Sequence, residues 1–172
     1  MIIYKDMVAE SKDELISDSF DLKEVADGIF YEADCAMIEI GAVNVDTGAN
    51  ASAEEAEEGT EDAAEKVNNI VHSFRLQQTS FDKKSWATTV KQYLTTLSKK
   101  QVENGVPKEE ADEHLKKCIN ACKEIVKTFK DWEFFTGESM DVDGMIVMMN
   151  YREDGVTPYM RFWKHGLESM KV

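Results

Sequence analysis

The chain lacks any apolar run that approaches the roughly 18–20 residues needed to cross a membrane. It begins with MIIYKDMVAESKDE, which turns acidic at once and lacks the charged start and long apolar stretch of a secretion signal. From these two absences we expect a soluble, unprocessed protein of the cytosol.

Cysteine is also scarce, with Cys35, Cys118 and Cys122 the only three in 172 residues. An odd number without a secretion signal argues against a disulfide framework. The absence of a CxxC pair argues against a cysteine-rich zinc site. Cys118 and Cys122 stand four residues apart, on one face of a predicted helix. We interpret them as small buried hydrophobic residues, and a redox pair or a soft-metal site is the alternative.

The motifs of common catalytic and nucleotide-binding sites are missing as well. Neither phosphate-binding glycine pattern, GxxxxGK[ST] or GxGxxG, occurs, and neither GxSxG nor HExxH is present. The histidines, His72, His114 and His165, fall in different kinds of segment and form no ligand set. We therefore expect a protein that is not an enzyme and that holds no cofactor.

One segment, Asp141-Val-Asp-Gly144, partly matches the calcium-binding loop of an EF-hand. It lacks the glutamate that should follow six residues after the glycine, because Asn150 stands there. A hairpin turn explains the segment without calcium.

Positive charge is in short supply, since 34 acidic and 20 basic side chains give a net charge of −14. Residues 1–65 contain 19 acidic and 3 basic side chains, whereas residues 66–131 contain 13 basic and 8 acidic ones. The overall charge repels nucleic acid, whose binding requires neutralised phosphates. The basic middle of an acidic chain predicts more than one kind of surface for protein partners.

Residues 41–66 differ in composition from the rest of the chain. Up to Glu65 they include no aromatic residue, Leu, Ile, Lys or Arg, so they bury too little apolar area to offset the entropy of ordering. We predict a long mobile acidic loop here, which binds divalent cations weakly and without a defined site. Its closely spaced carboxylates are Glu54, Glu55, Glu57, Glu58 and Glu61.

Short antiparallel strands are predicted on both sides of this loop. The strongest signal is a meander near the carboxyl end, where Gly-bearing connections separate three apolar runs. Val67–Leu76 is ambiguous between strand and helix; its alternating pattern favours a strand, with His72 as a structural residue. The expected strands are Met1–Asp6, Asp18–Val25, Ile29–Asp34, Cys35–Ile40 as a weak extension, Val67–Leu76, Trp132–Thr136, Met145–Tyr151 and Val156–Trp163.

Residues 82–130 predict two amphipathic helices. The first spans Asp82–Asn104, ends at Gly105, and is followed by a second that begins near Pro107. The short link implies an antiparallel hairpin. Its apolar stripes should place Leu115 and Ile119 against Val90, Tyr93 or Leu97.

Lysines follow the outer faces of this predicted hairpin. Charged residues opposite an apolar stripe are usually only a solvated face, but the acidity of the remaining chain also favours a basic surface that binds a partner. The lysines that we assign to this surface are Lys91, Lys99, Lys100, Lys116 and Lys117.

Several longer motifs follow one another along nearly the whole chain, namely MIIYKD, ELISDSFDLKEVADGIFYE, GANASAEEAEEGTE, LQQTSFDKKSW, KTFKDWEFFTGESMDVDGM and NYREDGVTPYM. Through these motifs the chain resembles fungal-like members of the translationally controlled tumour protein family. The resemblance implies one α+β domain over residues 1–172. Small antiparallel sheets form its β-tent core, with an inserted helical hairpin and a long mobile loop. Related Rab-accessory proteins hold zinc through CxxC pairs, which are absent here, so zinc is not expected.

The resemblance also implies functions. Members of this family act in protein synthesis, through the ribosome and the elongation factor that delivers aminoacyl-tRNA, and they stabilise microtubules by binding tubulin. We therefore expect a monomeric, cytoplasmic and partly cytoskeletal protein with several protein partners, but with no direct contact to nucleic acid or membranes. A calcium-responsive module with weak calcium binding is one alternative.

The other alternative is a modulator of guanine-nucleotide exchange on a Rheb-like or translational GTPase. The family residue linked to that role matches Glu14, in a segment that we expect to be irregular. The chain departs from the family pattern in its helical connection, KKQVENGVPKEEADEHLKK, and in its closing residues, ESMKV.

Overall fold

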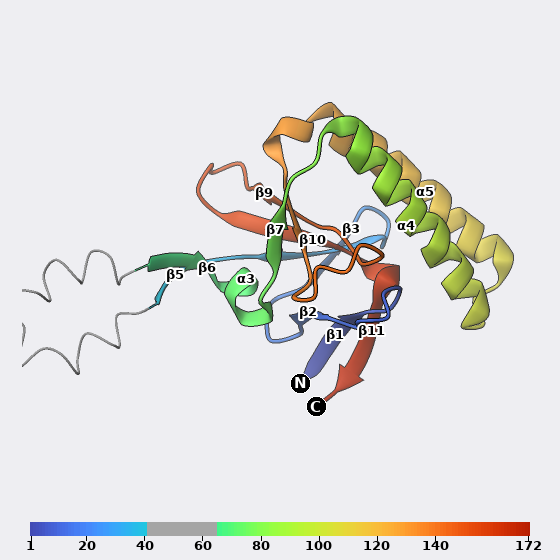
Figure 1. The fold of residues 1–172 in the computed structure, drawn as a ribbon, viewed down its shortest axis with the longest axis horizontal. Coiled ribbons are helices and arrows are strands. Elements are labelled where there is room, and N and C mark those ends of the chain that lie inside the picture. Colours follow the sequence, from blue (N-terminus) through green and yellow to red (C-terminus); the bar gives the residue numbers. More distant parts are fainter. Residues whose placement is uncertain (41–64) are drawn as a thin grey trace, which may run out of the picture.

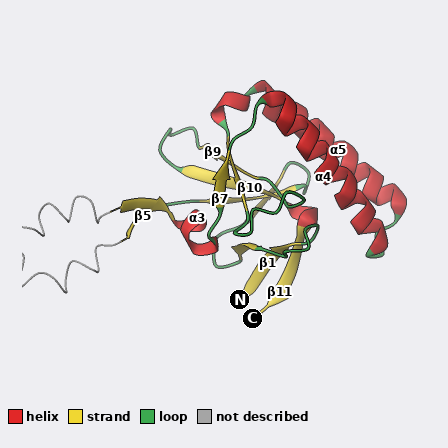
Figure 2. Ribbon diagram, in the orientation of Figure 1, coloured by secondary structure: helices red, strands yellow, loops and turns green. Residues whose placement is uncertain are grey.

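The computed structural model describes residues 1–40 and 65–172, which form antiparallel sheets and a helical hairpin (Figures 1 and 2). The predicted meander is confirmed as consecutive, paired strands of the largest sheet. Its last turn forms because Asp154 Oδ1 accepts hydrogen bonds from the N–H groups of Val156 and Thr157, both at 2.8 Å. The six strands lie in the order β3 (Lys23–Val25), β4 (Phe30–Asp34), β10 (Pro158–Trp163), β9 (Val147–Tyr151), β8 (Glu133–Thr136) and β7 (Gln77–Thr79).

A second sheet has three strands and contains both ends of the described chain (Figure 1). Its order is β11 (Leu167–Lys171), β1 (Ile2–Asp6) and β2 (Glu14–Ser17). The sequence places a strand at Asp18–Val25, but β2 ends before it and β3 begins within it. Leu15 and Ile16 are fully buried, whereas Asp18 lies in the following turn and accepts a hydrogen bond from the Ile2 N–H at 3.0 Å. Only Lys23–Val25 of the predicted segment is therefore a strand, and Asp18 belongs to the turn that follows β2.

The segment Val67–Leu76 is not one strand, contrary to the prediction. It contains the end of β6 (Glu65–Asn68) and the short helix α3 (Asn69–Phe74). Asn68 caps this helix, because its Oδ1 accepts hydrogen bonds from the N–H groups of Ile70 at 2.9 Å and Val71 at 3.2 Å. The apolar residues of this segment do not share one element, because Val67 lies in β6 whereas Ile70 and Phe74 lie in α3.

Among the described residues, strands β5 (Met37–Ile40) and β6 pair only with each other and form a ribbon that extends from the body (Figure 1). The weak prediction that Cys35–Ile40 extends the neighbouring ladder is therefore wrong. Residues 65 and 66, which we assigned to the acidic loop, belong to β6. The remainder of that loop, including Glu54, Glu55, Glu57, Glu58 and Glu61, lies outside the described residues, so its mobility stays a prediction.

Helices α4 (Lys83–Glu103) and α5 (Lys108–Lys127) form the predicted antiparallel hairpin. Asp82 begins α4 with a capping box, because its side chain accepts a hydrogen bond from the Ser85 N–H at 2.7 Å. The stripe on α4 is buried as expected, but Leu115 on α5 is only half-buried, and so is its neighbour Ile119. Burial on α5 centres instead on the stripe Ala111, Cys118, Cys122 and Ile125, in which three of the four side chains are small.

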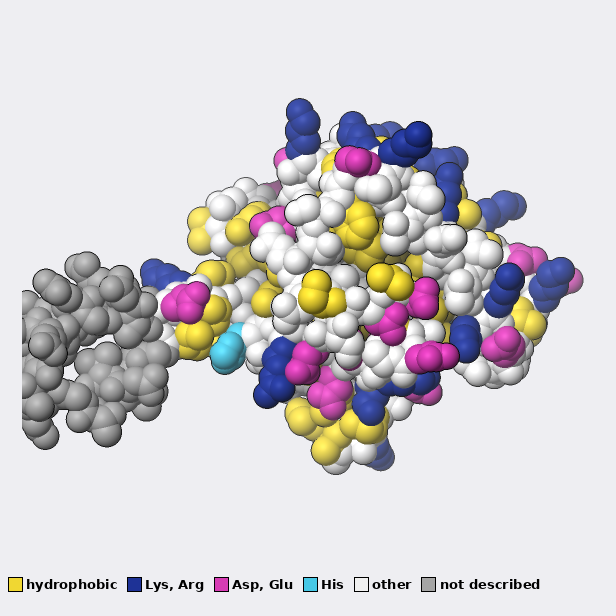
Figure 3. Space-filling view, viewed as in Figure 1, with side chains coloured by type: hydrophobic (Ala, Val, Ile, Leu, Met, Phe, Trp, Pro, Cys, Tyr) yellow, Lys and Arg dark blue, Asp and Glu magenta, His cyan; other side chains and the backbone are white. Residues whose placement is uncertain are grey.

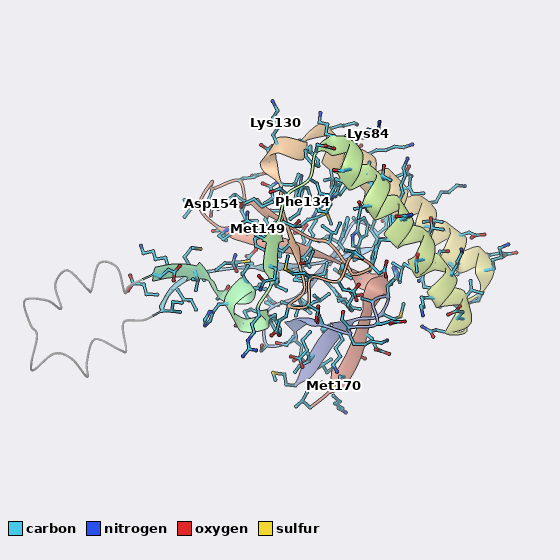
Figure 4. All side chains as sticks on the ribbon, in the orientation of Figure 1. Lys84, Lys130, Phe134, Met149, Asp154 and Met170 are labelled. Atoms are coloured by element: carbon cyan, nitrogen blue, oxygen red, sulfur yellow. The ribbon has the colours of Figure 1, made fainter. Side chains whose placement is uncertain are left out.

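One hydrophobic core joins the hairpin to the sheets. Trp86 of α4 packs against Phe134 of β8 with ring centroids 5.6 Å apart, and Figure 4 labels Phe134 beside Met149 in the interior. At the other end of the hairpin, His114 of α5 stacks on His165 of the short helix η2 (Lys164–Gly166) at 3.9 Å. Within the described parts of the chain, no helix has the length and apolar character needed to cross a membrane.

Candidate functional site: the pocket beside Glu14

The carboxylate of Asp13 joins the loop before β2 to the loop after β8. Its Oδ1 accepts a hydrogen bond from the Ser139 Oγ at 2.7 Å, and its Oδ2 accepts one from the Ser139 N–H at 3.0 Å. Gly137 permits this approach, because a methyl group there would lie 2.6 Å from the Asp13 Cβ. We call these three residues, Asp13, Gly137 and Ser139, the Asp13 clamp.

A second carboxylate, that of Asp6, is buried and holds the adjoining turns. Its Oδ1 accepts hydrogen bonds from the N–H groups of Val8 at 3.0 Å and Ala9 at 3.3 Å, and its Oδ2 accepts one from the Met145 N–H at 2.6 Å. Gly144 lies so close that a methyl group there would be 2.9 Å from Oδ2. Burial raises the pKa of Asp6, while the three hydrogen bonds act in the opposite direction.

Beside the Asp13 clamp lies an open pocket of about 460 Å³. The first two strands, α3 and the loop after β8 supply its walls. Three cations and three carboxylates line it, so the formal charges of its lining cancel. We call it the Glu14 pocket; its lining residues are Lys5, Lys12, Asp13, Glu14, Ser73, Phe74, Arg75 and Glu138.

Glu14 is exposed at the start of β2, directly opposite Lys5 on β1. Glu168 of β11 is opposite the same lysine on its other side, so three alternating charges cross the sheet. Opposite charges in such cross-strand positions contribute about 0.2–1 kcal/mol. The prediction that Glu14 lies in an irregular segment is therefore wrong, because a strand fixes its position in the pocket wall.

Three residues in or next to this pocket have left-handed backbone conformations without being glycine. They are Lys12 with φ 52°, Arg75 with φ 55° and Met140 with φ 53°. This conformation costs about 1–2 kcal/mol for a residue with a Cβ atom. The side chains of two of them form exposed ion pairs, Lys12 with Glu168 and Arg75 with Glu138, each at 3.2 Å. Backbone strain of this kind concentrates at binding and switch sites, which supports the Glu14 pocket as the candidate site.

The structure separates the lysines of the predicted partner surface. Lys91, Lys99 and Lys116 are exposed on the hairpin. Lys117 is partly buried and pairs with a glutamate one turn earlier on α5 at 3.8 Å. Lys100 lines a second pocket, of about 520 Å³, between α4 and two loops that contain acidic residues. Three of the five lysines are therefore exposed, and two are partly buried.

Other lysines gather where the hairpin joins the body (Figure 3). Lys84 in the first turn of α4 and Lys130 in the short helix η1 (Phe129–Asp131) are both exposed, and Figure 4 labels them at the same end of the molecule. Neither residue is among the five lysines that the sequence assigned to the partner surface.

Comparison with known proteins decides the family. The family model for translationally controlled tumour protein matches residues 1–168. The chain is 60% identical to the translationally-controlled tumor protein homolog of Gibberella zeae and 53% identical to that of Saccharomyces cerevisiae, with 100% of each chain covered. The chain belongs to the translationally controlled tumour protein family. The resemblance to fungal members is thereby confirmed.

Solved structures support the same fold for this family member. The translationally controlled tumor-associated protein p23fyp from Schizosaccharomyces pombe matches with a TM-score of 0.81 at 51% identity, over 100% of both chains. The protein from Caenorhabditis elegans matches with a TM-score of 0.72 at 26% identity, over 100% of this chain and 99% of that one. The predicted α+β architecture of small antiparallel sheets and a helical hairpin is confirmed.

The described residues of this family member do not assemble a metal site. Residues 1–40 and 65–172 contain no group of three or more His, Cys, Asp or Glu side chains that could hold a metal ion. Asp141 serves the turn instead, because its Oδ1 accepts a hydrogen bond from the Asp143 N–H at 3.0 Å, and this bond lowers the pKa of Asp141. The segment therefore fits the turn interpretation. Diffuse calcium binding by residues 41–64 stays a prediction, because the structure does not describe these residues.

The cysteines have the environment of core residues. Burial raises the pKa of Cys118 and Cys122 to about 12 and that of Cys35 to about 11. The thiolate is the form that attacks disulfides and binds metals. The structure therefore supports the packing interpretation over a redox pair or a soft-metal site.

Sequence reasoning missed Asp13, Ser139 and Arg75 at the candidate site. Asp13 and Ser139 are 126 positions apart, so no local pattern connects them. The one available signal was Gly137, which we interpreted only as part of a hairpin connection.

Proposed function

We propose that this chain is a non-enzymatic adaptor of the cytosol that binds several protein partners and acts in protein synthesis and on microtubules. The observation that carries this proposal is the set of exposed lysines, Lys91, Lys99 and Lys116, on a hairpin that extends from a strongly acidic protein. Such a surface attracts acidic partners, among which the acidic tails of tubulin and acidic surfaces of translation factors are candidates. Family membership supports the same roles.

Charge reversal of these lysines tests the adaptor proposal. The triple variant Lys91→Glu, Lys99→Glu and Lys116→Glu should lose co-sedimentation with microtubules and with ribosomes. The contact should also weaken steeply as salt rises, because the Debye length is only about 8 Å at physiological ionic strength.

A matched control for this variant carries the same change in net charge away from the hairpin, at the exposed Lys23, Lys66 and Lys171. It should bind as the wild type does. Equal binding by the wild type and by a folded hairpin variant would contradict the assignment of this surface.

Modulation of a GTPase is the second candidate, and Glu14 favours it. A strand holds this exposed carboxylate in the wall of a charged pocket, beside residues with strained backbones. A carboxylate presented near a GTPase magnesium site would loosen the bound nucleotide by like-charge repulsion.

Nucleotide release tests this second candidate. Glu14→Gln should slow release from a Rheb-like GTPase or from the aminoacyl-tRNA elongation factor relative to the wild type. Stability should change by less than about 0.5 kcal/mol, since the side chain is exposed. Glu10→Gln, at an exposed acid of the preceding turn, is the control. If the wild type at micromolar concentration alters release from neither GTPase, only the adaptor proposal remains.

A further inference from the structure

Ser139 carries the hydroxyl that closes the Asp13 clamp, and the residue is exposed. It lies in a stretch of turns between β8 and β9 that has no regular structure. Surface loops held by a rigid scaffold are where an enzyme can reach a side chain.

Acidic residues stand on both sides of this hydroxyl in the sequence. Glu138 precedes Ser139 directly, and Asp141 and Asp143 follow it at the second and fourth positions. Such a segment is complementary in charge to the substrate groove of a kinase that selects acidic sequences. We propose that Ser139 is a phosphorylation site for an acidophilic serine/threonine kinase, and that its phosphate opens the Asp13 clamp and turns toward Arg75 and Lys12.

The modification is an ordinary phosphoryl transfer. The γ-phosphoryl group of ATP moves to the Ser139 Oγ, the bond to the β-phosphate oxygen breaks, and ADP leaves. The hydroxyl proton passes to the catalytic base of the kinase. The product carries about −1.5 to −2 charges at pH 7.

The phosphate cannot coexist with the closed clamp. The transfer removes the O–H group from which Asp13 Oδ1 accepts a hydrogen bond. The Ser139 Oγ and the Asp13 Oδ1 are only 2.7 Å apart in this bond. It also places a strong negative charge against the Asp13 carboxylate, and like charges at such separations repel. The loop therefore moves away from Asp13, and the Ser139 N–H loses its acceptor.

Cations for the phosphate are already present in the adjoining Glu14 pocket. Arg75 and Lys12 line it, and Arg75 contacts Glu138, the residue next to Ser139, at 3.2 Å. A guanidinium can bind phosphate with two parallel hydrogen bonds, whereas the present contact between Arg75 and Glu138 is a single, exposed hydrogen bond. Phosphorylation would thus change the charge around Glu14 and regulate binding at this pocket, but the modification itself does not depend on the proposed function.

Mapping the phosphate tests the site. The purified full chain is incubated with ATP and an acidophilic serine/threonine kinase, and the modified residue is located by mass spectrometry. Most of the phosphate should be on Ser139 and should disappear in Ser139→Ala. Asp13→Ala should accelerate the transfer several-fold, because it releases the hydroxyl.

The matched control is Ser11→Ala, since Ser11 is also exposed and is followed by acidic residues. This variant should be phosphorylated as fully as the wild type. Phosphate found on Ser11 or elsewhere, but not on Ser139, would overturn the proposal.

Two readouts on the phosphoprotein test the switch. The Ser139 amide should exchange with solvent at least tenfold faster than in the unmodified protein, and unchanged protection would refute opening of the clamp. In a phosphorus NMR titration, nearby cations should lower the second pKa of the phosphate below its ordinary value of about 6. That pKa should rise in Arg75→Gln; the same value in this variant and in the wild type would refute the contact with Arg75.

Discussion

Asp6 shows how much of this structure can depend on one side chain. It is 3% exposed and accepts hydrogen bonds from three backbone N–H groups of two different loops. A buried donor left without an acceptor costs about 1–3 kcal/mol. Removing one carboxylate here leaves several such donors at once.

We expect Asp6→Ala to lower the free energy of unfolding by about 3 kcal/mol or more, as measured by urea denaturation. Asp18→Ala is the matched control, because Asp18 is exposed and accepts from only one backbone N–H, that of Ile2. The control should lose no more than about 1 kcal/mol. Similar losses in both variants would argue against the role of Asp6.

His165 gives the protein a sensitivity to acid. Burial, together with the adjacent His114 and Lys164, lowers the pKa of His165 to about 4. In the unfolded chain the pKa of His165 is about 6.5. Between pH 6.5 and 4, His165 is therefore protonated in the unfolded state but remains neutral in the folded state. Stability from this group is complete above pH 6.5 and is lost as the pH falls toward 4.

Urea unfolding across this pH range should show a decline that His165→Gln makes shallower. The slope from one such group is at most about 1.4 kcal/mol per pH unit, and partial solvation of the ring reduces it. The control is His72→Gln, at an exposed residue of α3. Parallel profiles for wild type and His165→Gln would contradict the prediction.

At the scale of elements, the sequence predicts what local chemistry controls. Asp154 and Gly155 produce the β9–β10 turn within a few residues of chain, and the α4 stripe repeats with helical period, so both elements were predicted. Val67–Leu76 misled because the decisive residue is the cap, Asn68, and not the alternating apolar residues. The Asp13 clamp was beyond prediction, because its partners come together only in the folded chain.

The two helices of the hairpin should differ in their response to truncation. Leu97 of α4 is 3% exposed, so Leu97→Ala should lower the free energy of unfolding by about 2–5 kcal/mol. Leu115 of α5 is half-buried, so Leu115→Ala should cost about half as much or less. Chemical denaturation of the two variants measures the difference. A larger loss of stability for Leu115→Ala than for Leu97→Ala would contradict the prediction that α4 is the more deeply buried helix.

At the scale of the whole molecule, the ribbon closes the ends of the acidic segment. Ile40 of β5 is paired with Glu65 of β6, so the chain leaves and returns at neighbouring points. Deleting residues 45–61 should shift the melting temperature by less than about 3 °C, because closure entropy depends only weakly on loop length. Calorimetry of the deleted and full chains is the measurement, and a large drop would show that the segment packs on the core.

The three-stranded sheet has a consequence for the order in which the chain folds. Its central strand, β1, pairs on one side with β2 and on the other with β11, so Ile2 lies opposite Lys171. During synthesis β1 emerges early, but it cannot pair with β11 until almost the whole chain has been made. Contacts between such distant positions slow folding, because the loop must close before the contact forms. A circular permutant that joins β11 directly to β1 would turn this last step into a local hairpin and should fold faster.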